Sequence, residues 1–502
     1  MPSGPLRVLM VSSEVESLAR TGGLGDAVEA LSRALAAQGA SVVVATPRYG
    51  VTRVPAGARL WPDPIVAPLG LGHARTMGVL EAPLAGPAGT TAGDPRRAPR
   101  VTLLCDPLFD RDGIYGDRRG TFLDNAFRFA ALSSGALSAA ERAWDGALPD
   151  VVHAHDWHAA LALVYARRTR GAAWARVPTV LTIHNLAFQG VLAPSEFDYL
   201  AIPRDAWDHG WIRHEGAINL MKGGIVYSNF VTTVSPRYAY EIRNTHLGMG
   251  LQGALSVHQR KFGGVLNGLD YGLWNPELDR HIPKRYGIRS IQNKYANKEA
   301  LRQRLWLRGG MKPIVSFIGR LDPQKGVDLI LHAVPDCLER GCQFVLLGSS
   351  LQSDINSAFW NLKLRFNDHP DCHLEIGYNE ELAHLIYAGS DLLLVPSGYE
   401  PCGLTQIIAL KYGTVPLVRN TGGLADTVFD ANYAAKPYQE RNGYVFNDYN
   451  WEGLESALDR AIGLWNEYPD YFRELMLNGM RCDYSWNHPG QNYQNIYNYI
   501  KA

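Results

Sequence analysis

The sequence predicts an α/β protein made of two doubly wound domains that face each other across a cleft. Three observations lead to this fold class. Short apolar strands alternate with amphipathic helices in the first half, a second alternation begins near Pro313, and 502 residues are too many for one hydrophobic core. Strands joined through helices form parallel sheets with right-handed crossovers. We expect the domains at 1–255 and 256–485.

The first half opens with a strand, a helix and a second strand. The segment "RVLMVSSE" is a short apolar strand, "DAVEALSRALAAQGA" has helical spacing with Gly39 as a stop, and "SVVVATPRY" is the next strand. A Pro- and Gly-rich segment, 82–99, predicts an exposed loop. The remaining strands are expected at 101–106, 151–155, 179–184 and 230–235.

The second half repeats this alternation and ends in helices. Its tail, 451–502, is rich in aromatic residues and has helical spacing. Ligands of doubly wound sheets bind at the carboxyl ends of the strands, so the functional residues should follow the strands directly. The strands of the second half are expected at 313–320, 343–349, 372–378, 391–397 and 414–420.

Charge and cysteine content exclude several classes of protein. Lys and Arg together number 49, as do Asp and Glu, so no global field attracts nucleic acid or an anionic membrane. The six cysteines are scattered without a CxxC pair, which indicates reduced thiols in a cytoplasmic protein. The first residues do not form a signal peptide, and no apolar run reaches membrane-spanning length.

Composition changes along the chain. Asn occurs 7 times in 1–290 and 17 times in 291–502. Ordinary drift between domains and a fusion of two halves near residue 290 both account for this change.

A glycine-rich stretch occurs twice, as "RTGGLGDAV" at 20–28 and "NTGGLADTV" at 420–428. The first copy follows a strand and precedes a helix, so its glycines let backbone N–H groups approach a phosphate, and Arg20 adds a charge. A tight strand-to-helix turn without a ligand is the alternative. A dinucleotide site is disfavoured, because the second strand ends in Pro47 and Arg48 and no acidic residue follows to hold a ribose.

Polar residues end two other strands of the first half. "VVHAHDWH" places histidines around Asp156, and "TIHN" places His184 at a second strand end. A metal site would need further ligands, and no motif elsewhere supplies them. We therefore expect these side chains to hydrogen-bond a hydroxylated ligand.

The second half offers cations and a carboxylate in similar places. Arg320 and Lys325 lie in the loop after one strand, where they could neutralise a diphosphate. Glu400 follows another strand and precedes a helix that begins near Cys402 and Thr405. The carboxylate could accept sugar hydroxyls or stabilise positive charge at a sugar carbon. A solvated surface loop is the alternative for the two cations.

Together these motifs carry a family resemblance. In order along the chain, they resemble bacterial glycogen synthase and plant starch synthase over essentially the whole length; the motifs are "TGGLGD", "HAHDWH", "TIHNLAFQG", "GVLNGLDYGLWNP", "GRLDPQKG", "PSGYEPCGLTQ" and "PLVRNTGGLADTV". The resemblance implies the GT-B architecture of two Rossmann-like domains, with a last helix at 486–502 that packs back on the first domain. It implies retaining transfer of glucose from ADP-glucose to the non-reducing end of an α-1,4-glucan such as glycogen or a maltooligosaccharide.

The resemblance also implies a role for each matching residue. No cofactor or metal is expected, and no nucleic acid or membrane partner. The residues expected to act in catalysis are Asp156, His184, Arg320, Lys325 and Glu400. Those expected to bind substrate are Arg20, Gly22, Gly23, Asp26, Tyr115, Asn267, Cys402, Gly403, Leu404, Thr405, Gly422 and Gly423.

The chain departs from the family pattern at two positions. Arg20 stands where the family has Lys, which keeps the charge but changes its geometry. Gly398 stands where the family usually has Arg or another large residue. A UDP-glucose-dependent or other GT-B transferase, a glucan phosphorylase with a pyridoxal cofactor, and a weakly active fused variant that binds glucan are the alternatives.

The expected mechanism is same-face attack within an ion pair. The leaving phosphate oxygen would accept the proton of the acceptor hydroxyl, with Asp156 and Glu400 as orienting groups. A carboxylate nucleophile on the opposite face is the alternative route to retention.

Overall fold

The computed structural model describes residues 4–84, 98–366 and 368–502, and these divide into two compact units. The first unit contains residues up to Gly268 together with 485–502, and the second contains Leu269–Tyr484. The sequence-based boundary at 255/256 falls inside α8 (Gln252–Val257), whereas the observed division follows β15 (Phe262–Gly264). Strand β15 pairs with β14 (Phe230–Thr233) of the first unit, so the first unit continues beyond the predicted boundary.

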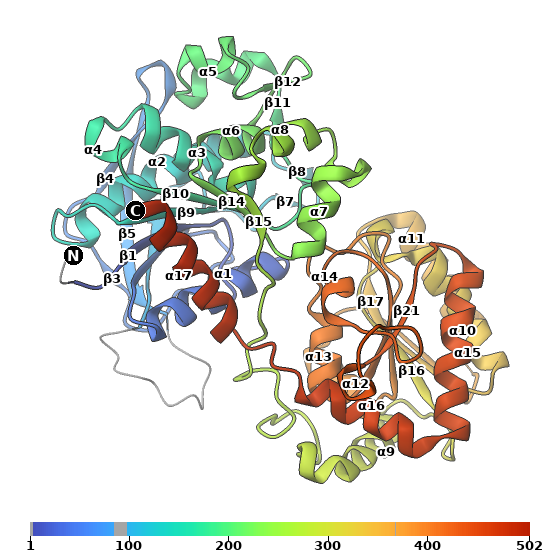
Figure 1. The fold of residues 1–502 in the computed structure, drawn as a ribbon. Helices are drawn as coiled ribbons and strands as arrows, with labels where there is room; N and C mark the ends of the chain where they lie inside the picture. Colours follow the sequence, from blue (N-terminus) through green and yellow to red (C-terminus); the bar gives the residue numbers. More distant parts are fainter. Residues whose placement is uncertain (1–3, 85–97, 367) are drawn as a thin grey trace. The chain divides into compact units, whose positions relative to one another are not determined.

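A mixed sheet forms the centre of the first unit (Figure 1). Its middle strands are parallel, and its β3–β5–β6 edge is antiparallel. In spatial order the strands are β15, β14, β10 (Thr179–Ile183), β9 (Val151–His155), β1 (Arg7–Val11), β2 (Ser41–Pro47), β6 (Arg100–Cys105), β5 (Ala74–Pro83) and β3 (Arg59–Leu60), with β4 (Ile65–Pro68) beside β5. Short ribbons are formed by β7 (Gly116–Asp117) with β8 (Gly120–Thr121) and by β13 (Ala217–Asn219) with β11 (Val191–Leu192) and β12 (Arg213–His214).

Helices cover both faces of this sheet because its strands are apolar on both sides. Val8 and Met10 pack in the core that includes α1 (Gly23–Ala37) and α17 (Asn487–Lys501), whereas Leu9 and Val11 pack in the core that includes α2 (Asn125–Ala143) and α3 (Asp156–Arg168). This alternation follows the two-residue period of a strand. The other helices are α4 (Ala172–Ala175), α5 (Arg204–Asp208), α6 (Leu220–Tyr227), α7 (Pro236–Asn244) and α8.

The chain returns to the first unit at its end. Gln38 at the end of α1 donates a hydrogen bond to the carbonyl of Asn487, and Tyr493 and Tyr497 of α17 are buried in the α1 core. A Cβ on Gly268 would lie 2.8 Å from the backbone of Trp486, so the segments that contain these two residues are in close contact. The expected contact of the last helix with the first domain is thus present in the structure.

The second unit is built on a parallel sheet with helices on both faces. One core lies between the sheet and α9 (Lys294–Arg304) and α12 (Glu380–Gly389). The other lies between the sheet and α10 (Val327–Glu339), α13 (Thr405–Lys411), α15 (Trp451–Glu467) and α16 (Pro469–Arg481). In spatial order the strands are β18 (Cys372–Ile376), β17 (Gln343–Ser349), β16 (Ile314–Arg320), β19 (Leu392–Val395), β20 (Val415–Arg419) and β21 (Tyr444–Phe446). The other helices of this unit are α11 (Ser353–Phe366) and α14 (Gly422–Thr427).

Most predicted strands are present, but the antiparallel edge was missed. Strands β3, β4 and β5 follow each other without intervening helices, so they break the alternation on which the prediction relied. The loop predicted at 82–99 is partly wrong, because Ala82 and Pro83 belong to β5 and Ala82 is buried. Residues 85–97 of that loop lie outside the described residues.

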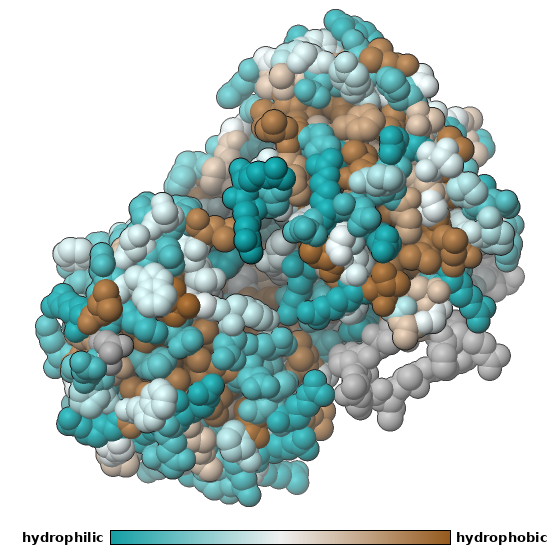
Figure 2. Space-filling model, turned by 180° about the vertical axis from the view of Figure 1, so that it is seen from behind, coloured by the Kyte–Doolittle hydropathy of each residue, from teal (hydrophilic) through white to brown (hydrophobic). Residues whose placement is uncertain are grey.

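Figure 2 shows hydrophilic and hydrophobic residues interspersed over the face in view. Among the described helices, none combines the length and apolar character that crossing a membrane requires.

Candidate active site

The first glycine-rich turn is held by a buried carboxylate that follows β1. Glu14 accepts hydrogen bonds from the backbone N–H of Thr21 at 2.6 Å and of Gly22 at 3.2 Å, and from Thr21 Oγ1 at 2.9 Å. Gly22 is the N-cap of α1, and both Gly22 and Gly23 are exposed. A Cβ on Gly22 would meet nothing within 4 Å, so the backbone of this turn is open to a ligand.

Arg20 and Asp26 of this turn bind each other. Arg20 Nη1 lies 2.6 Å from Asp26 Oδ1 and 3.2 Å from Glu16 Oε1. A Cβ on Gly25 would lie 3.1 Å from Arg20 Cβ, so the close approach of helix and loop favours glycine there. The two residues predicted to face the donor therefore form an ion pair with each other.

Tyr115 is joined to the same turn. Its hydroxyl donates to Glu14 Oε1 at 2.6 Å and lies 2.8 Å from Ser13 Oγ, and its ring stacks on His158 at 4.7 Å between centroids. Burial, followed by the charge of Glu14, raises the pKa of Tyr115 well above its ordinary value. Glu14 thus connects two segments that were predicted to bind the nucleotide.

Asp156 and His184 meet at the carboxyl ends of β9 and β10. Asp156 Oδ1 accepts a hydrogen bond from the His184 backbone N–H at 2.7 Å. Asp156 begins α3 with φ of 57°, a left-handed conformation that costs a non-glycine residue energy and is common at functional sites. Burial raises the pKa of Asp156 to about 7, although backbone N–H groups of His184 and Asn185 oppose this shift. Near neutral pH, the protonated and ionised forms of the Asp156 carboxyl group are therefore both populated.

A chain of buried polar groups continues beneath these residues. His153 Nδ1 lies 2.8 Å from the Tyr497 hydroxyl, and its Nε2 lies 2.7 Å from Thr182 Oγ1. The rings of His153 and His155 lie 4.2 Å apart, so the two side chains share a face of the strand. Through Tyr497, helix α17 contacts the strand that ends at the predicted sugar site.

Asn267 is distant in sequence from the residues described above, and it is also buried. It follows β15, whose pairing with β14 places it at the same end of the sheet. Its role in sugar binding stays a prediction.

In the second unit, Lys325 and Glu400 form a short ion pair. Lys325 Nζ lies 2.5 Å from Glu400 Oε2, and the two side chains are 18% and 7% exposed. Ser397 Oγ donates to the same oxygen at 2.9 Å. Removing one partner of a largely buried pair leaves an uncompensated charge that costs about 3–5 kcal/mol. Arg320, in contrast, is 62% exposed and lies 3.3 Å from Asp322.

Gly422 and Gly423 of the second glycine-rich turn pack against the loop that carries Glu400. A Cβ on Gly422 would lie 1.8 Å from the Glu400 carbonyl oxygen, and one on Gly423 would lie 1.9 Å from the Cys402 carbonyl oxygen. The Gly423 N–H donates to the Glu400 carbonyl at 3.0 Å. These glycines fix the position of the loop, and a direct contact with a ligand stays a prediction.

The segment from Cys402 to Thr405 forms a tight turn before α13. Gly403 has φ of 73°, a left-handed conformation, and its Cβ would lie 2.4 Å from Gln406 Oε1, so the position favours glycine. Gln406 Nε2 donates to the carbonyls of Cys402 and Gly403. Leu404 is the N-cap residue of α13. The predicted residues 402–405 are thus rigidly placed beside Glu400.

Arg419 at the end of β20 holds the other side of this loop. Its guanidinium donates to the carbonyls of Ser397, at 2.7 Å, and of Gly398. A Cβ on Gly398 would make only ordinary contacts, 3.7 Å from Tyr449 and 3.8 Å from the Gln324 carbonyl. The space beside Gly398 accommodates a Cβ, and nothing in the structure explains why glycine stands at this position.

Several residues of these sites were missed in the sequence. Glu14, Ser397 and Arg419 each support a predicted residue through hydrogen bonds. Glu14 and Arg419 lie at or just beyond strand ends, and the same rule that selected Asp156 would have found them. No comparable sequence signal marks the dependence of the loop on Gly422.

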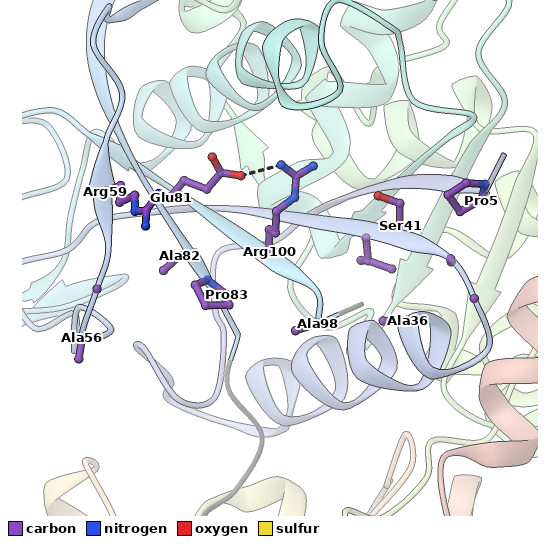
Figure 3. A pocket seen from close by; sticks show the side chains of 14 residues that line it. Pro5, Ala36, Ser41, Ala56, Arg59, Glu81, Ala82, Pro83, Ala98 and Arg100 are labelled. Atoms are coloured by element: carbon purple, nitrogen blue, oxygen red, sulfur yellow. Dashed lines mark hydrogen bonds and ion pairs between the residues drawn. The ribbon is translucent and has the colours of Figure 1, made fainter. Parts of the chain in front are cut away.

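A cavity of about 820 Å³ lies in the first unit, away from these residues. It is lined by the end of α1 and by the amino ends of β2 and β6, including Ser41 and Arg100 (Figure 3). Arg100 forms an ion pair with Glu81 at 2.8 Å beside it. The residues predicted in the first unit follow the carboxyl ends of the parallel strands, whereas the cavity lies at the amino ends of β2 and β6.

One group of side chains in the described part of the second unit has the composition of a metal site. His332 and Asp336 of α10 and Glu455 of α15 each bring one ligand atom within 4.8 Å of the others. His332 Nε2 already lies 2.7 Å from Glu455 Oε1, and Asp336 binds Arg340 at 2.7 Å. This ion-pair network accounts for the cluster without a metal ion.

Comparison with known proteins places this geometry in a family. The family description "Starch synthase catalytic domain" matches residues 7–257, and "Glycosyl transferases group 1" matches residues 299–474. The chain is 49% identical to glycogen synthase 1 of Nitrosococcus oceani over 98% of its length and 99% of that protein's length. It is also 49% identical to glycogen synthase 2 of Methylococcus capsulatus, with the same coverage.

A solved structure agrees with these relatives. The catalytic domain of starch synthase IV from Arabidopsis thaliana, bound to ADP and acarbose, is 33% identical with a TM-score of 0.90, over 99% of this chain and 100% of that chain. The expected GT-B fold is confirmed by this likeness. This chain belongs to the glycogen and starch synthase family of glycosyltransferases.

Proposed function

We propose that this enzyme transfers glucose from ADP-glucose to the non-reducing end of an α-1,4-glucan with retention of configuration and without a metal ion. The observation that carries the proposal is the Lys325–Glu400 ion pair at 2.5 Å beside the ends of β16 and β19. The bound ADP and acarbose of the related starch synthase, a nucleotide and a glucan-like sugar, support this choice of donor and acceptor.

Residues of the second unit suit the departure of ADP. Negative charge grows on the leaving diphosphate, and a preorganised cation stabilises it. Lys325 is fixed by Glu400, whereas Arg320 is exposed and able to move onto a phosphate. When the diphosphate engages Lys325, Glu400 is free to accept hydrogen bonds from sugar hydroxyls.

Residues of the first unit suit the sugar. Asp156, at a strained backbone position, offers a carboxyl oxygen, and His184 lies beside it. We propose that both orient the glucose while the leaving phosphate oxygen takes the acceptor proton on the same face. A covalent glucosyl–enzyme trapped on Asp156 or Glu400 would replace this mechanism with a double displacement.

The decisive experiment measures glucose incorporation into glycogen with ADP-glucose and UDP-glucose as parallel donors, with and without EDTA. We expect incorporation from ADP-glucose that is unchanged by the chelator. Preference for UDP-glucose would replace the donor, and loss of activity in EDTA would replace the metal-free mechanism.

Two rivals are separated by simple controls. A glucan phosphorylase would release glucose 1-phosphate from glycogen and phosphate, and its pyridoxal cofactor would absorb in the near ultraviolet. A weakly active fused variant would bind glycogen in affinity electrophoresis without turnover. We also propose a cytoplasmic location, because the structure shows the cysteines as thiols.

A further inference from the structure

His184 contacts a second histidine that has no assigned role. His155 Nδ1 lies 3.0 Å from His184 Nε2, and both rings are neutral because burial lowers their pKa values, that of His184 to about 3. A hydrogen bond between two neutral imidazoles needs one donor and one acceptor. Which ring donates decides which atom of His184 carries its proton.

The surroundings of His155 decide this question. His155 is 1% exposed, and its Nε2 is buried without a hydrogen-bond partner in the part of the chain that the structure describes. If His184 donated, His155 would carry its proton on Nε2 as an orphaned buried N–H. Among buried backbone groups, orphaned N–H donors are rarer than under-satisfied acceptors. The same preference, applied to this imidazole, places the proton of His155 on Nδ1, where it has a partner.

The geometry points to His155 as the residue that fixes the tautomer of His184. His155 donates from Nδ1 to His184 Nε2, and His184 must then carry its own proton on Nδ1. We infer that His184 presents an Nδ1–H donor to an oxygen of the bound substrate and that His155 is its positioning residue.

This inference rests on the proposed function and assigns a chemical role within it. Both ring nitrogens of His184 are committed, because Nε2 accepts from His155 and Nδ1 carries a proton. His184 therefore donates a hydrogen bond to a sugar hydroxyl oxygen and does not act as a general base. The proton of the acceptor hydroxyl must go to another group.

Paired amide substitutions at His184 test the donor. The side-chain nitrogen of Asn can occupy the place of Nδ1, whereas that of Gln reaches the place of Nε2. We expect His184→Asn to keep kcat within about tenfold, and His184→Gln and His184→Phe to lose about a hundredfold, as for other lost donors. Equal losses in all three variants would overturn the donor role, and His373→Asn on β18 controls for the substitution itself.

Substitutions at His155 test the positioning role. His155→Asn keeps a donor in the place of Nδ1, whereas His155→Leu removes the donor together with the orphaned Nε2. We expect His155→Leu to melt no lower than the wild type yet to lose kcat, and His155→Asn to restore it. Higher activity in His155→Leu than in His155→Asn would show that His155 only fills space.

Nitrogen-15 NMR of the histidine rings reads the tautomer without turnover. The His184 signals, assigned by their loss in His184→Asn, should show a protonated Nδ1 and a bare Nε2 in the wild type, and a changed ratio in His155→Leu. A protonated Nε2 in the wild type would overturn the inference. Because this measurement needs no substrate, it separates failure of the inference from failure of the proposed function.

Discussion

The two glycine-rich turns share a sequence and differ in the reason for their glycines. Gly22 has an extended backbone with φ of −162°, lies at the surface, and leaves open space where a side chain would be. Gly422 has φ of 46°, is buried, and lies against the Glu400 carbonyl. The same four letters, "TGGL", therefore serve access in one unit and packing in the other.

The carboxylates at the two sites differ as well. Glu400 is paired with Lys325, whereas none of the described cations forms an ion pair with Asp156. Burial therefore raises the pKa of Asp156 to about 7. The second unit offers a preformed ion pair, and the first offers a carboxyl group that gains or loses a proton near neutral pH.

The largest expected effect follows from filling the packed turn. In Gly423→Ala the new Cβ must displace the Cys402 carbonyl, which lies 1.9 Å away, and with it the loop that holds Glu400. We expect a loss of about 2–4 kcal/mol of unfolding free energy and a fall in kcat of about a hundredfold or more. Chemical denaturation and the transfer assay measure the two effects.

Gly463→Ala is the matched control for this change. Gly463 lies within α15 of the same unit, and its Cβ would meet nothing within 4 Å. Alanine in a helix is about 0.5–1 kcal/mol more favourable than glycine, so this variant should be slightly stabilised. Equal behaviour of the two variants would remove the distinction between the turns.

The second prediction concerns the carboxyl group of Asp156, which forms no ion pair with the described cations. Its raised folded-state pKa means that the folded protein binds a proton more tightly than the unfolded chain. Stability from this group is therefore present below pH 4 and is lost as the pH rises towards 7. Relative to Asp156→Asn, the wild type should lose up to about 4 kcal/mol of unfolding free energy between pH 4 and 8. A pH-independent difference would show that Asp156 does not titrate in this range.

The third prediction tests the carboxylate beneath the open turn. Glu14→Ala removes the acceptor of four partly buried hydrogen bonds, including that of Tyr115. We expect a loss of about 2–4 kcal/mol of unfolding free energy. A double-mutant cycle with Tyr115→Phe should show coupling, and strict additivity would mean that Glu14 does not join the two segments.

The strand ends were predictable because both units repeat a simple pattern. Apolar strands alternate with helices, so the amino-acid sequence alone was enough to place Asp156 and Glu400 at the carboxyl ends of parallel strands. The position of Glu14 after a strand could have been selected by the same rule, but its hydrogen-bonding role could not be predicted, because its partners include backbone N–H groups that depend on the path of the loop. The packing of Gly422 on Glu400 joins residues about twenty positions apart, and such contacts leave no periodic signal.

The fourth prediction separates access from packing at the open turn. Gly22→Ala adds a Cβ that meets nothing, at a φ that any residue adopts, so unfolding free energy should change by less than about 0.5 kcal/mol. If the backbone approaches the donor phosphates closely, the same methyl group should raise KM for the donor several-fold. An unchanged KM would make this turn a structural turn like its counterpart.

The smallest effect is expected at Arg20. Its ion pairs with Asp26 and Glu16 are partly exposed, and such pairs contribute about 0–1 kcal/mol, so Arg20→Lys should barely change stability. Lysine keeps the positive charge but replaces a planar fork with a single ammonium. If Arg20 only supplies charge near the donor, kcat/KM should stay within about threefold in Arg20→Lys and fall about tenfold or more in Arg20→Ala. Asp26→Asn completes the test, because it should lower KM for the donor if the ion pair restrains Arg20. An unchanged KM would mean either that Arg20 reaches the phosphates with Asp26 still bound or that it does not reach them at all. The result for Arg20→Ala distinguishes these two cases.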